Sequence, residues 1–188
     1  MEAHVADVLE TLDSLGIERA DWVGYSFGGL VAAAGAAAHP ARVRRLALLE
    51  PGLSLPPAMC LQYAHEELED RSFATEEEAI ADMLSAGTIF HAPREMLEEE
   101  ARTNTVRGAD GRLRYRYSRP GAIGAWSELA GPPPPVAGAP TLIVLGERSW
   151  VEVDTARHPD ARVLTVPGGH SVLWDAFEET ASALEGFL

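Results

Sequence analysis

The chain has 188 residues, of which 46% are hydrophobic and 23% charged, and its formal net charge at pH 7 is −14. This length is typical of one globular domain, and the hydrophobic share excludes a wholly disordered chain. With 15 basic against 29 acidic side chains, the chain lacks the clustered cations that bind a phosphate backbone. We therefore expect no nucleic-acid partner.

The amino terminus has neither the basic region nor the apolar stretch of a signal peptide. The longest run of small apolar residues, 30–38, has about half the length of a membrane span. The single cysteine, Cys60, cannot form an internal disulfide, so nothing indicates an oxidising compartment. These features predict a soluble, cytoplasmic protein that does not associate with membranes.

Helix and strand patterns alternate at the start of the chain. An amphipathic stripe with helical spacing precedes Gly16 and consists of Val5, Val8, Leu9, Leu12 and Leu15. Residues 21–25 then predict a short strand, residues 28–38 an alanine-rich helix that ends before Pro40, and residues 43–49 a second strand.

The alternation returns near the carboxyl terminus. Residues 141–145 and 161–166 predict a third and a fourth strand, and residues 172–188 predict a closing helix. Strands that alternate with helices form parallel βαβ units. The sequence therefore predicts an α/β fold with a mostly parallel sheet of about four strands, covered on both faces.

The two alternating parts, 1–52 and 136–188, would form this core, and residues 53–135 would form a separate helical insertion. Within the insertion, Thr75 predicts a capped helix start, Pro93 precedes another helix, and residues 113–117 predict a strand or loop edge. Residues 66–100 alone hold 12 acidic and 2 basic side chains, so most of the negative charge belongs to the insertion.

Gly24-Tyr25-Ser26-Phe27-Gly28-Gly29 follows a predicted strand and opens a predicted helix. A G-x-S-x-G turn is so tight that only small residues fit two positions before the serine and two or three after it. The helix amino terminus behind Ser26 would also direct unpaired amides at developing negative charge. The alternative is a glycine-rich turn that carries a serine by chance.

A nucleophilic serine needs a general base, because its hydroxyl is protonated at pH 7. Of the six histidines, His170 is the one placed just past the carboxyl end of a predicted strand, and Ser26 occupies the same kind of position. Active sites of parallel sheets form at this edge. The sequence thus pairs Ser26 with His170, although a histidine in a loop is often merely solvated.

These motifs, together with RVRRLALLEP, APTLIVLGERS and ARVLTVPGGH in this order, resemble the α/β-hydrolase fold family over essentially the whole chain. The resemblance implies that Ser26 is an acyl-forming nucleophile, that His170 is its general base and later acid, and that the backbone N–H of Phe27 contributes to an oxyanion hole. It also implies that residues 53–135 form a helical cap over the active site.

The third member of a catalytic triad departs from the family pattern. The resemblance leads us to expect an aspartate at position 149 or 150, where this chain has Ser149 and Trp150. Some family members take the acid from the end of the preceding strand, a place that Glu50 occupies here. We therefore favour Glu50 as the acid that orients His170, ahead of Glu147 and Asp154.

Family members also have further strands before the elbow, one of which is followed by a loop that donates a second oxyanion N–H. In family members these strands and their connections would occupy on the order of 60–90 residues, and this sequence starts at the helix that follows them. We expect either that Met1 is an internal methionine or that the gene is truncated. The first strand would then lie at an unpaired apolar sheet edge, which favours a homodimer, aggregation or pairing with a missing segment.

Together these features predict a serine hydrolase that cleaves a small neutral or hydrophobic ester or related acyl compound, without a metal or other cofactor. The acidic insertion would repel anionic substrates. Trp150 and Trp174 are placed to line an apolar acyl pocket or simply to pack in the core. The alternative is a catalytically inactive fragment or pseudoenzyme that binds a ligand or partner.

Overall fold

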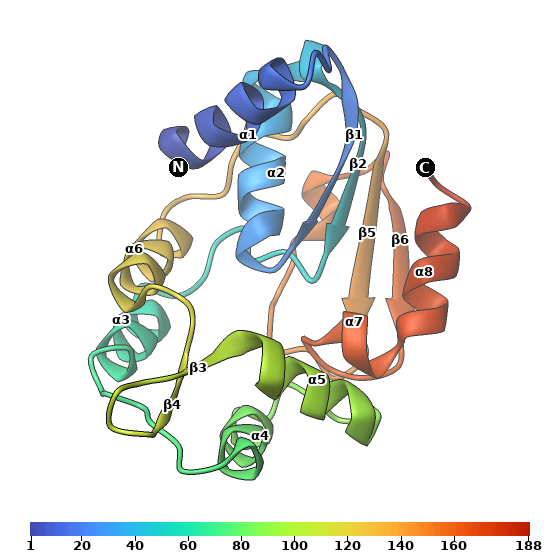
Figure 1. The fold of residues 1–188 in the computed structure, drawn as a ribbon. Coiled ribbons are helices and arrows are strands. Elements are labelled where there is room, and N and C mark those ends of the chain that lie inside the picture. Colours follow the sequence, from blue (N-terminus) through green and yellow to red (C-terminus); the bar gives the residue numbers. More distant parts are fainter.

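The computed structural model describes residues 1–188 and contains a four-stranded sheet with the order β1-β2-β5-β6 (Figure 1). The strands are β1 (Ala20–Tyr25), β2 (Val43–Leu49), β5 (Thr141–Gly146) and β6 (Arg162–Val166). All three neighbouring pairs are parallel. The predicted α/β class with about four parallel strands is confirmed.

Helices cover both faces of this sheet. The amino-terminal helices α1 (Glu2–Ser14) and α2 (Phe27–Ala38) lie on one face, and the carboxyl-terminal helices α7 (Val172–Asp175) and α8 (Phe177–Glu185) lie on the other. Two short 3₁₀ turns, η1 (Pro40–Arg42) and η2 (Thr155–Arg157), precede β2 and β6.

Alternation along β2 explains why the sheet has two cores. Leu46 and Leu48 pack with the alanines of α2, whereas Ala47 and Leu49 pack with α7 and α8. All four side chains are buried, which is typical of a parallel strand covered on both faces. Burial of each leucine contributes about 1.5–3 kcal/mol relative to an exposed one.

The closing helix predicted over residues 172–188 is wrong in one respect, because the chain leaves helical geometry at Ala176 (φ −141°, ψ 55°). The break directly follows Asp175, whose carboxylate accepts hydrogen bonds from backbone N–H groups of two other segments. Hydrophobic periodicity continues across the break, so the sequence pattern does not reveal it.

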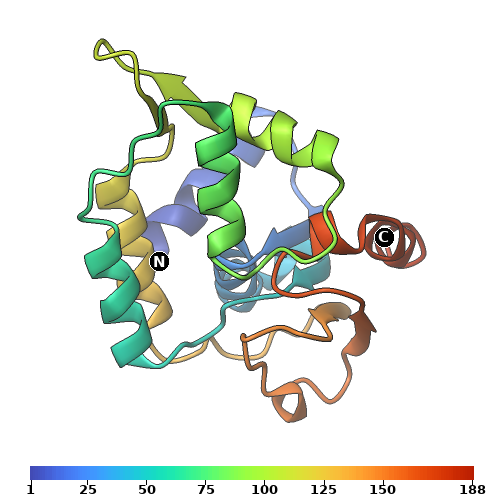
Figure 2. The same cartoon turned by 90° about the horizontal axis from the view of Figure 1, so that it is seen from below.

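The helices and the hairpin between β2 and β5 lie beyond the carboxyl ends of the strands, and the chain after α6 runs back to the amino end of β5 (Figures 1 and 2). This segment contains four helices and a two-stranded antiparallel hairpin: α3 (Pro57–Glu66), α4 (Glu76–Ser85), α5 (Arg94–Asn104), β3 (Thr105–Arg107), β4 (Leu113–Tyr115) and α6 (Arg119–Leu129). The helices predicted after Thr75 and Pro93 correspond to α4 and α5. Thr75 Oγ1 caps α4 by accepting a hydrogen bond from Glu78 N at 3.2 Å.

The outer edge of β1 has no partner strand. Val23 on this strand is 47% exposed, and a groove of about 500 Å³ lies between β1, α1 and α2. The homodimer expected through this edge stays a prediction. No helix of the structure combines the length and the apolar character needed to cross a bilayer.

Candidate active site

Ser26 lies in a strained turn between β1 and α2, with a positive φ of 51° and a ψ of −119°. The turn is held by Ser26 N, which donates to Leu49 O on the neighbouring strand at 3.0 Å. A left-handed φ is costly for a residue with a Cβ, so strong surrounding contacts must maintain it. The geometry is that of a G-x-S-x-G elbow.

The glycines around Ser26 differ in how much room they have. A Cβ at Gly24 would lie 2.3 Å from the Gly28 carbonyl oxygen, and one at Gly29 would lie 2.7 Å from Pro51 Cβ. A Cβ at Gly28, in contrast, would meet nothing within 4 Å, because Gly28 faces the open groove beside β1. Position 28 therefore has room for at least a Cβ, which positions 24 and 29 do not have.

A continuous chain of hydrogen bonds joins the three side chains singled out in the sequence. His170 Nε2 lies 2.8 Å from Ser26 Oγ, and His170 Nδ1 lies 3.0 Å from Glu50 Oε2. An ionised carboxylate can only accept, so Nδ1 carries the proton toward Glu50 and Nε2 is left to accept from the serine hydroxyl. This is the arrangement that a serine nucleophile and its base require.

Glu50 is fully buried and directly follows β2 with a positive φ of 46°. Gly146 N donates to its Oε1 at 2.6 Å, and Ser149 Oγ donates to its Oε2. A buried carboxylate needs such donors to replace water. The role of Ser149 was not predicted from the sequence. Ser149 occupies one of the positions where an aspartate was expected, and its hydroxyl donates a hydrogen bond to Glu50.

The two other acidic candidates lie away from His170. Glu147 is exposed, and its backbone N–H donates to Val166 O at 2.9 Å. Asp154 is also exposed and caps η2, because its Oδ1 accepts from Ala156 N at 3.2 Å. Glu50 is thus the candidate that the structure brings to the imidazole.

Phe27 is the first residue of α2. Its backbone N–H precedes the intrahelical hydrogen-bond ladder, as the first N–H groups of any helix do. The amide therefore lies next to Ser26 at the positive end of the helix dipole, where it can stabilise an anion.

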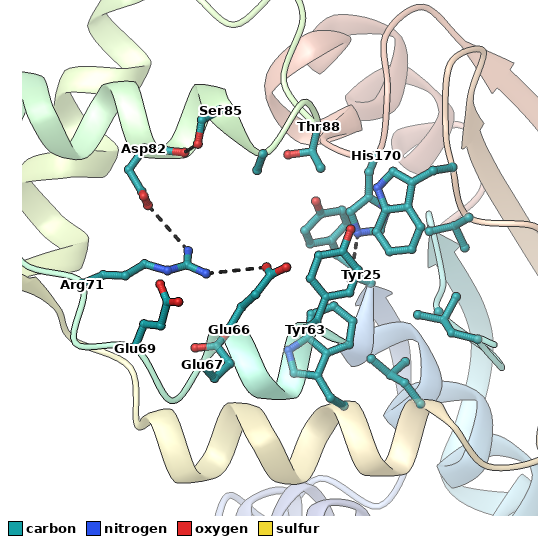
Figure 3. Close-up of a pocket in the computed structure, with 18 residues that line it drawn as sticks. Tyr25, Tyr63, Glu66, Glu67, Glu69, Arg71, Asp82, Ser85, Thr88 and His170 are labelled. Carbon is teal, nitrogen blue, oxygen red and sulfur yellow. Dashed lines mark hydrogen bonds and ion pairs between the residues drawn. The ribbon is translucent and has the colours of Figure 1, made fainter. Parts of the chain in front are cut away.

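A cavity of about 620 Å³ opens over Ser26 and His170, between the sheet and the helical segment (Figure 3). Its wall near Ser26 is mainly aromatic and aliphatic: Tyr25, Leu55, Tyr63, Trp126, Leu129, Trp150 and Val151. The ring centroid of Trp150 lies 5.2 Å from that of His170, and the ring centroid of Tyr25 lies 5.3 Å from it. Trp174 packs beside Tyr25 but does not line the cavity.

The far side of the cavity is polar and negatively charged. Arg71 faces Glu66 at 3.9 Å and Asp82 at 3.7 Å, and Glu67 and Glu69 complete this wall (Figure 3). Four carboxylates and one guanidinium therefore line this side of the cavity. No group of three or more His, Cys, Asp or Glu side chains in the structure is arranged to hold a metal ion.

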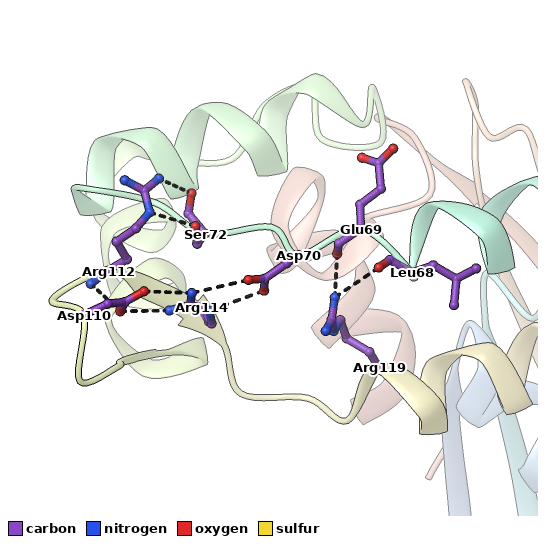
Figure 4. A network of polar contacts seen from close by, with 8 residues as sticks. All are labelled: Leu68, Glu69, Asp70, Ser72, Asp110, Arg112, Arg114 and Arg119. Atoms are coloured by element: carbon purple, nitrogen blue, oxygen red, sulfur yellow. Dashed lines mark hydrogen bonds and ion pairs between the residues drawn. The ribbon is translucent and has the colours of Figure 1, made fainter.

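Three arginines hold residues 68–72, the segment that carries Glu69 and Arg71 of this polar wall (Figure 4). Arg119 donates to the carbonyl oxygens of Leu68 and Glu69, and Arg112 donates to Ser72. Arg114 pairs with Asp70 and Asp110, and its guanidinium holds the pKa of Asp110 down at about 2. These contacts attach residues 68–72 to the hairpin and to α6.

The sequence profile of the alpha/beta hydrolase family matches residues 2–183. The chain belongs to the alpha/beta hydrolase family. Among curated relatives, the chain is 32% identical over 145 residues to lipase LipV of Mycobacterium tuberculosis, an alignment that covers 76% of this chain and 55% of the lipase. It is 33% identical over 131 residues to a 2-hydroxymuconate semialdehyde hydrolase of Pseudomonas putida, which covers 69% of this chain and 40% of that enzyme.

Solved structures of alpha/beta hydrolases share the fold. An E-2-(acetamidomethylene)succinate hydrolase superposes with a TM-score of 0.82 at 22% identity, covering 97% of this chain and 71% of that one. An esterase described as from a marine microorganism superposes with a TM-score of 0.72 at 20% identity, covering 100% and 77%. The chain thus spans between two fifths and little more than half of the two curated relatives described above.

Proposed function

We propose that this alpha/beta hydrolase is a serine hydrolase that cleaves a small neutral or hydrophobic ester, or a related acyl compound, through an acyl-enzyme. The observation that carries the proposal is the hydrogen-bonded chain from Ser26 through His170 to Glu50. Curated relatives named as a lipase and as hydrolases support the broader assignment to hydrolysis.

In the proposed reaction, Ser26 Oγ attacks the acyl carbon while its proton passes to His170 Nε2. The oxygen of the tetrahedral intermediate faces the Phe27 N–H. His170 then returns the proton to the leaving alcohol, which departs and leaves an acyl group on Ser26. A water molecule, deprotonated by His170, attacks this ester and releases the acid, and Ser26 recovers its proton.

Glu50 has an electrostatic part in this proposal. Its carboxylate accepts a hydrogen bond from His170 Nδ1 and stabilises the imidazolium that forms in both half-reactions. Because Glu50 is fully buried, this attraction is less screened than it would be in water.

The cavity supports the proposed substrate class. Its wall beside Ser26 is aromatic and aliphatic, whereas the far wall has four carboxylates against one guanidinium. Such a field repels an anionic acyl chain and tolerates a neutral one. We propose that residues 53–135 act as the cap that encloses this substrate.

A fluorophosphonate probe tests the nucleophile directly. We expect the folded protein to be labelled at Ser26, Ser26→Ala to lose labelling, and the exposed-site control Ser182→Ala to keep it. Absence of labelling in folded wild-type protein would overturn the hydrolase proposal in favour of a ligand-binding pseudoenzyme.

Two matched esters test the substrate class. p-Nitrophenyl butyrate is neutral, and the p-nitrophenyl hemiester of succinate has a similar length but carries a carboxylate. We expect kcat/KM to be about 10-fold or more lower for the charged ester at low salt, with a smaller gap at high salt because ions screen the repulsion. Equal kcat/KM values would contradict the proposed class.

A further inference from the structure

Asp175, at the end of α7, accepts hydrogen bonds from three backbone N–H groups. Its Oδ1 accepts from Phe90 N and from His91 N, both at 2.7 Å, and its Oδ2 accepts from Gly169 N at 2.9 Å. Hydrogen bonds to an ionised acceptor are about twice as strong as neutral ones. Both oxygens of this carboxylate are therefore engaged with the backbone.

The three amides belong to segments far apart in the sequence. Phe90 and His91 lie between α4 and α5, in the proposed cap, whereas Gly169 directly precedes His170. Ser171 N also donates to Thr88 O at 3.1 Å, which joins the same two segments on the other side of His170. The residues directly before and after His170 are thus both tied by hydrogen bonds: Gly169 to Asp175, and Ser171 to Thr88.

Packing reinforces these hydrogen bonds. A Cβ at Gly169 would lie 2.4 Å from the Phe90 ring, so the ring rests directly on the Gly169 backbone. The Arg148 guanidinium covers the Phe90 ring at 4.1 Å from its centroid. This arrangement leaves little room for the two segments to slide past each other.

The segment held in this way forms part of the cavity. Ser85, Ala86 and Thr88 line it on the side of α4. Thr88 lies close to His170, whereas Ser85 lies farther away, beside Asp82 (Figure 3). Asp175 therefore joins the segment next to this wall to the segment that carries the imidazole.

We propose that Asp175 is a positioning residue that locks residues 88–91 to the loop of His170, and that this lock sets the width of the acyl cavity and the placement of the imidazole. The effects on kinetics rest on the proposed hydrolase function, whereas the attachment of residues 88–91 to the His170 loop through Asp175 does not. Asp175→Ala removes both acceptor oxygens. Asp175→Asn keeps one oxygen and replaces the other with a donor that cannot accept from an N–H group.

Amide hydrogen exchange tests the lock without any substrate. In Asp175→Ala we expect the Phe90, His91 and Gly169 amides to exchange about 10-fold or more faster, with the strands of the sheet unchanged. Asp175→Asn should give an intermediate effect, and the exposed control Asp160→Ala should give none. Unchanged exchange at these three amides in the folded alanine variant would overturn the proposal, as would equal acceleration throughout the sheet.

Kinetics then test the consequence for the cavity. We expect Asp175→Ala to raise KM several-fold more for a p-nitrophenyl octanoate ester than for the acetate ester, because the longer chain needs the α4 wall in place. An equal change in KM for both esters would overturn the assigned control of cavity width. If the fluorophosphonate probe does not label Ser26 in the wild-type protein, the hydrolase proposal is overturned, but the hydrogen-exchange test of Asp175 remains valid.

Discussion

Ser149 Oγ donates a hydrogen bond to Glu50 Oε2, the same carboxylate oxygen that lies 3.0 Å from His170 Nδ1. The hydroxyl and the imidazole thus share one oxygen, while Gly146 N holds the other at 2.6 Å. Because Glu50 is fully buried, these donors replace the water that its carboxylate loses on folding. Ser149 thus stabilises the carboxylate of Glu50 by a hydrogen bond, although it is not itself the acidic residue beside His170.

Replacing Ser149 by alanine is expected to destabilise the protein. The variant leaves a buried carboxylate with one donor fewer, and a hydrogen bond to a charged group contributes about 1.5–3 kcal/mol. We expect the free energy of unfolding, measured by urea denaturation at pH 7, to fall by about this amount. Ser149→Thr keeps the hydroxyl and should recover most of the loss, and equal stability of the alanine variant and the wild type would contradict the assignment.

Glu50→Gln tests the acid of the proposed triad. The amide keeps the size of the side chain but loses its charge, so it no longer stabilises the imidazolium of His170. We expect kcat for a neutral ester to fall by about 10²–10⁴-fold. Glu147→Gln is the matched control at an exposed residue and should leave kcat unchanged. Full turnover by a folded Glu50→Gln variant would show that Glu50 is not the acid that stabilises the His170 imidazolium.

Two glycines of the elbow are expected to respond in opposite ways to a single methyl group. Gly24→Ala places a Cβ 2.3 Å from the Gly28 carbonyl oxygen, and because the obstacle is backbone we expect a loss of about 3 kcal/mol or failure to fold. Gly28→Ala meets open space near the start of α2, so the free energy of unfolding should stay the same or rise by up to about 1 kcal/mol. Urea denaturation of both variants measures this difference. An equal change in the free energy of unfolding in the two variants would contradict the prediction.

Burial raises the pKa of the Tyr25 phenol to about 12 from its ordinary value of 10.0. Between these two values the folded state holds the phenolic proton more tightly than the unfolded state does, so stability falls as pH rises. We expect the free energy of unfolding to decline less steeply between pH 10 and pH 12 in Tyr25→Phe than in the wild type. Parallel declines in urea denaturation series would show that Tyr25 does not contribute.

Local patterns in the sequence were enough to predict the four parallel strands, the elbow at Ser26 and the position of His170 at the end of a strand. Each of these depends on residues that are close in the chain: glycines that fit a tight turn, or apolar runs with a strand or helix period. Membership of the alpha/beta hydrolase family follows from the same motifs, and residues 2–183 match it. The choice of Glu50 over Glu147 and Asp154 was favoured by the sequence but left open.

Tertiary contacts settled which residues meet. Ser149 reaches Glu50 across 99 positions of the chain, and Asp175 reaches Phe90 across 85. The break at Ala176, which separates α7 from α8, follows directly after Asp175, and the open space at Gly28 exists because β1 lies at the sheet edge. No local propensity encodes such relationships, because they depend on which distant backbone and side-chain groups the packed sheet brings within hydrogen-bond or van der Waals distance.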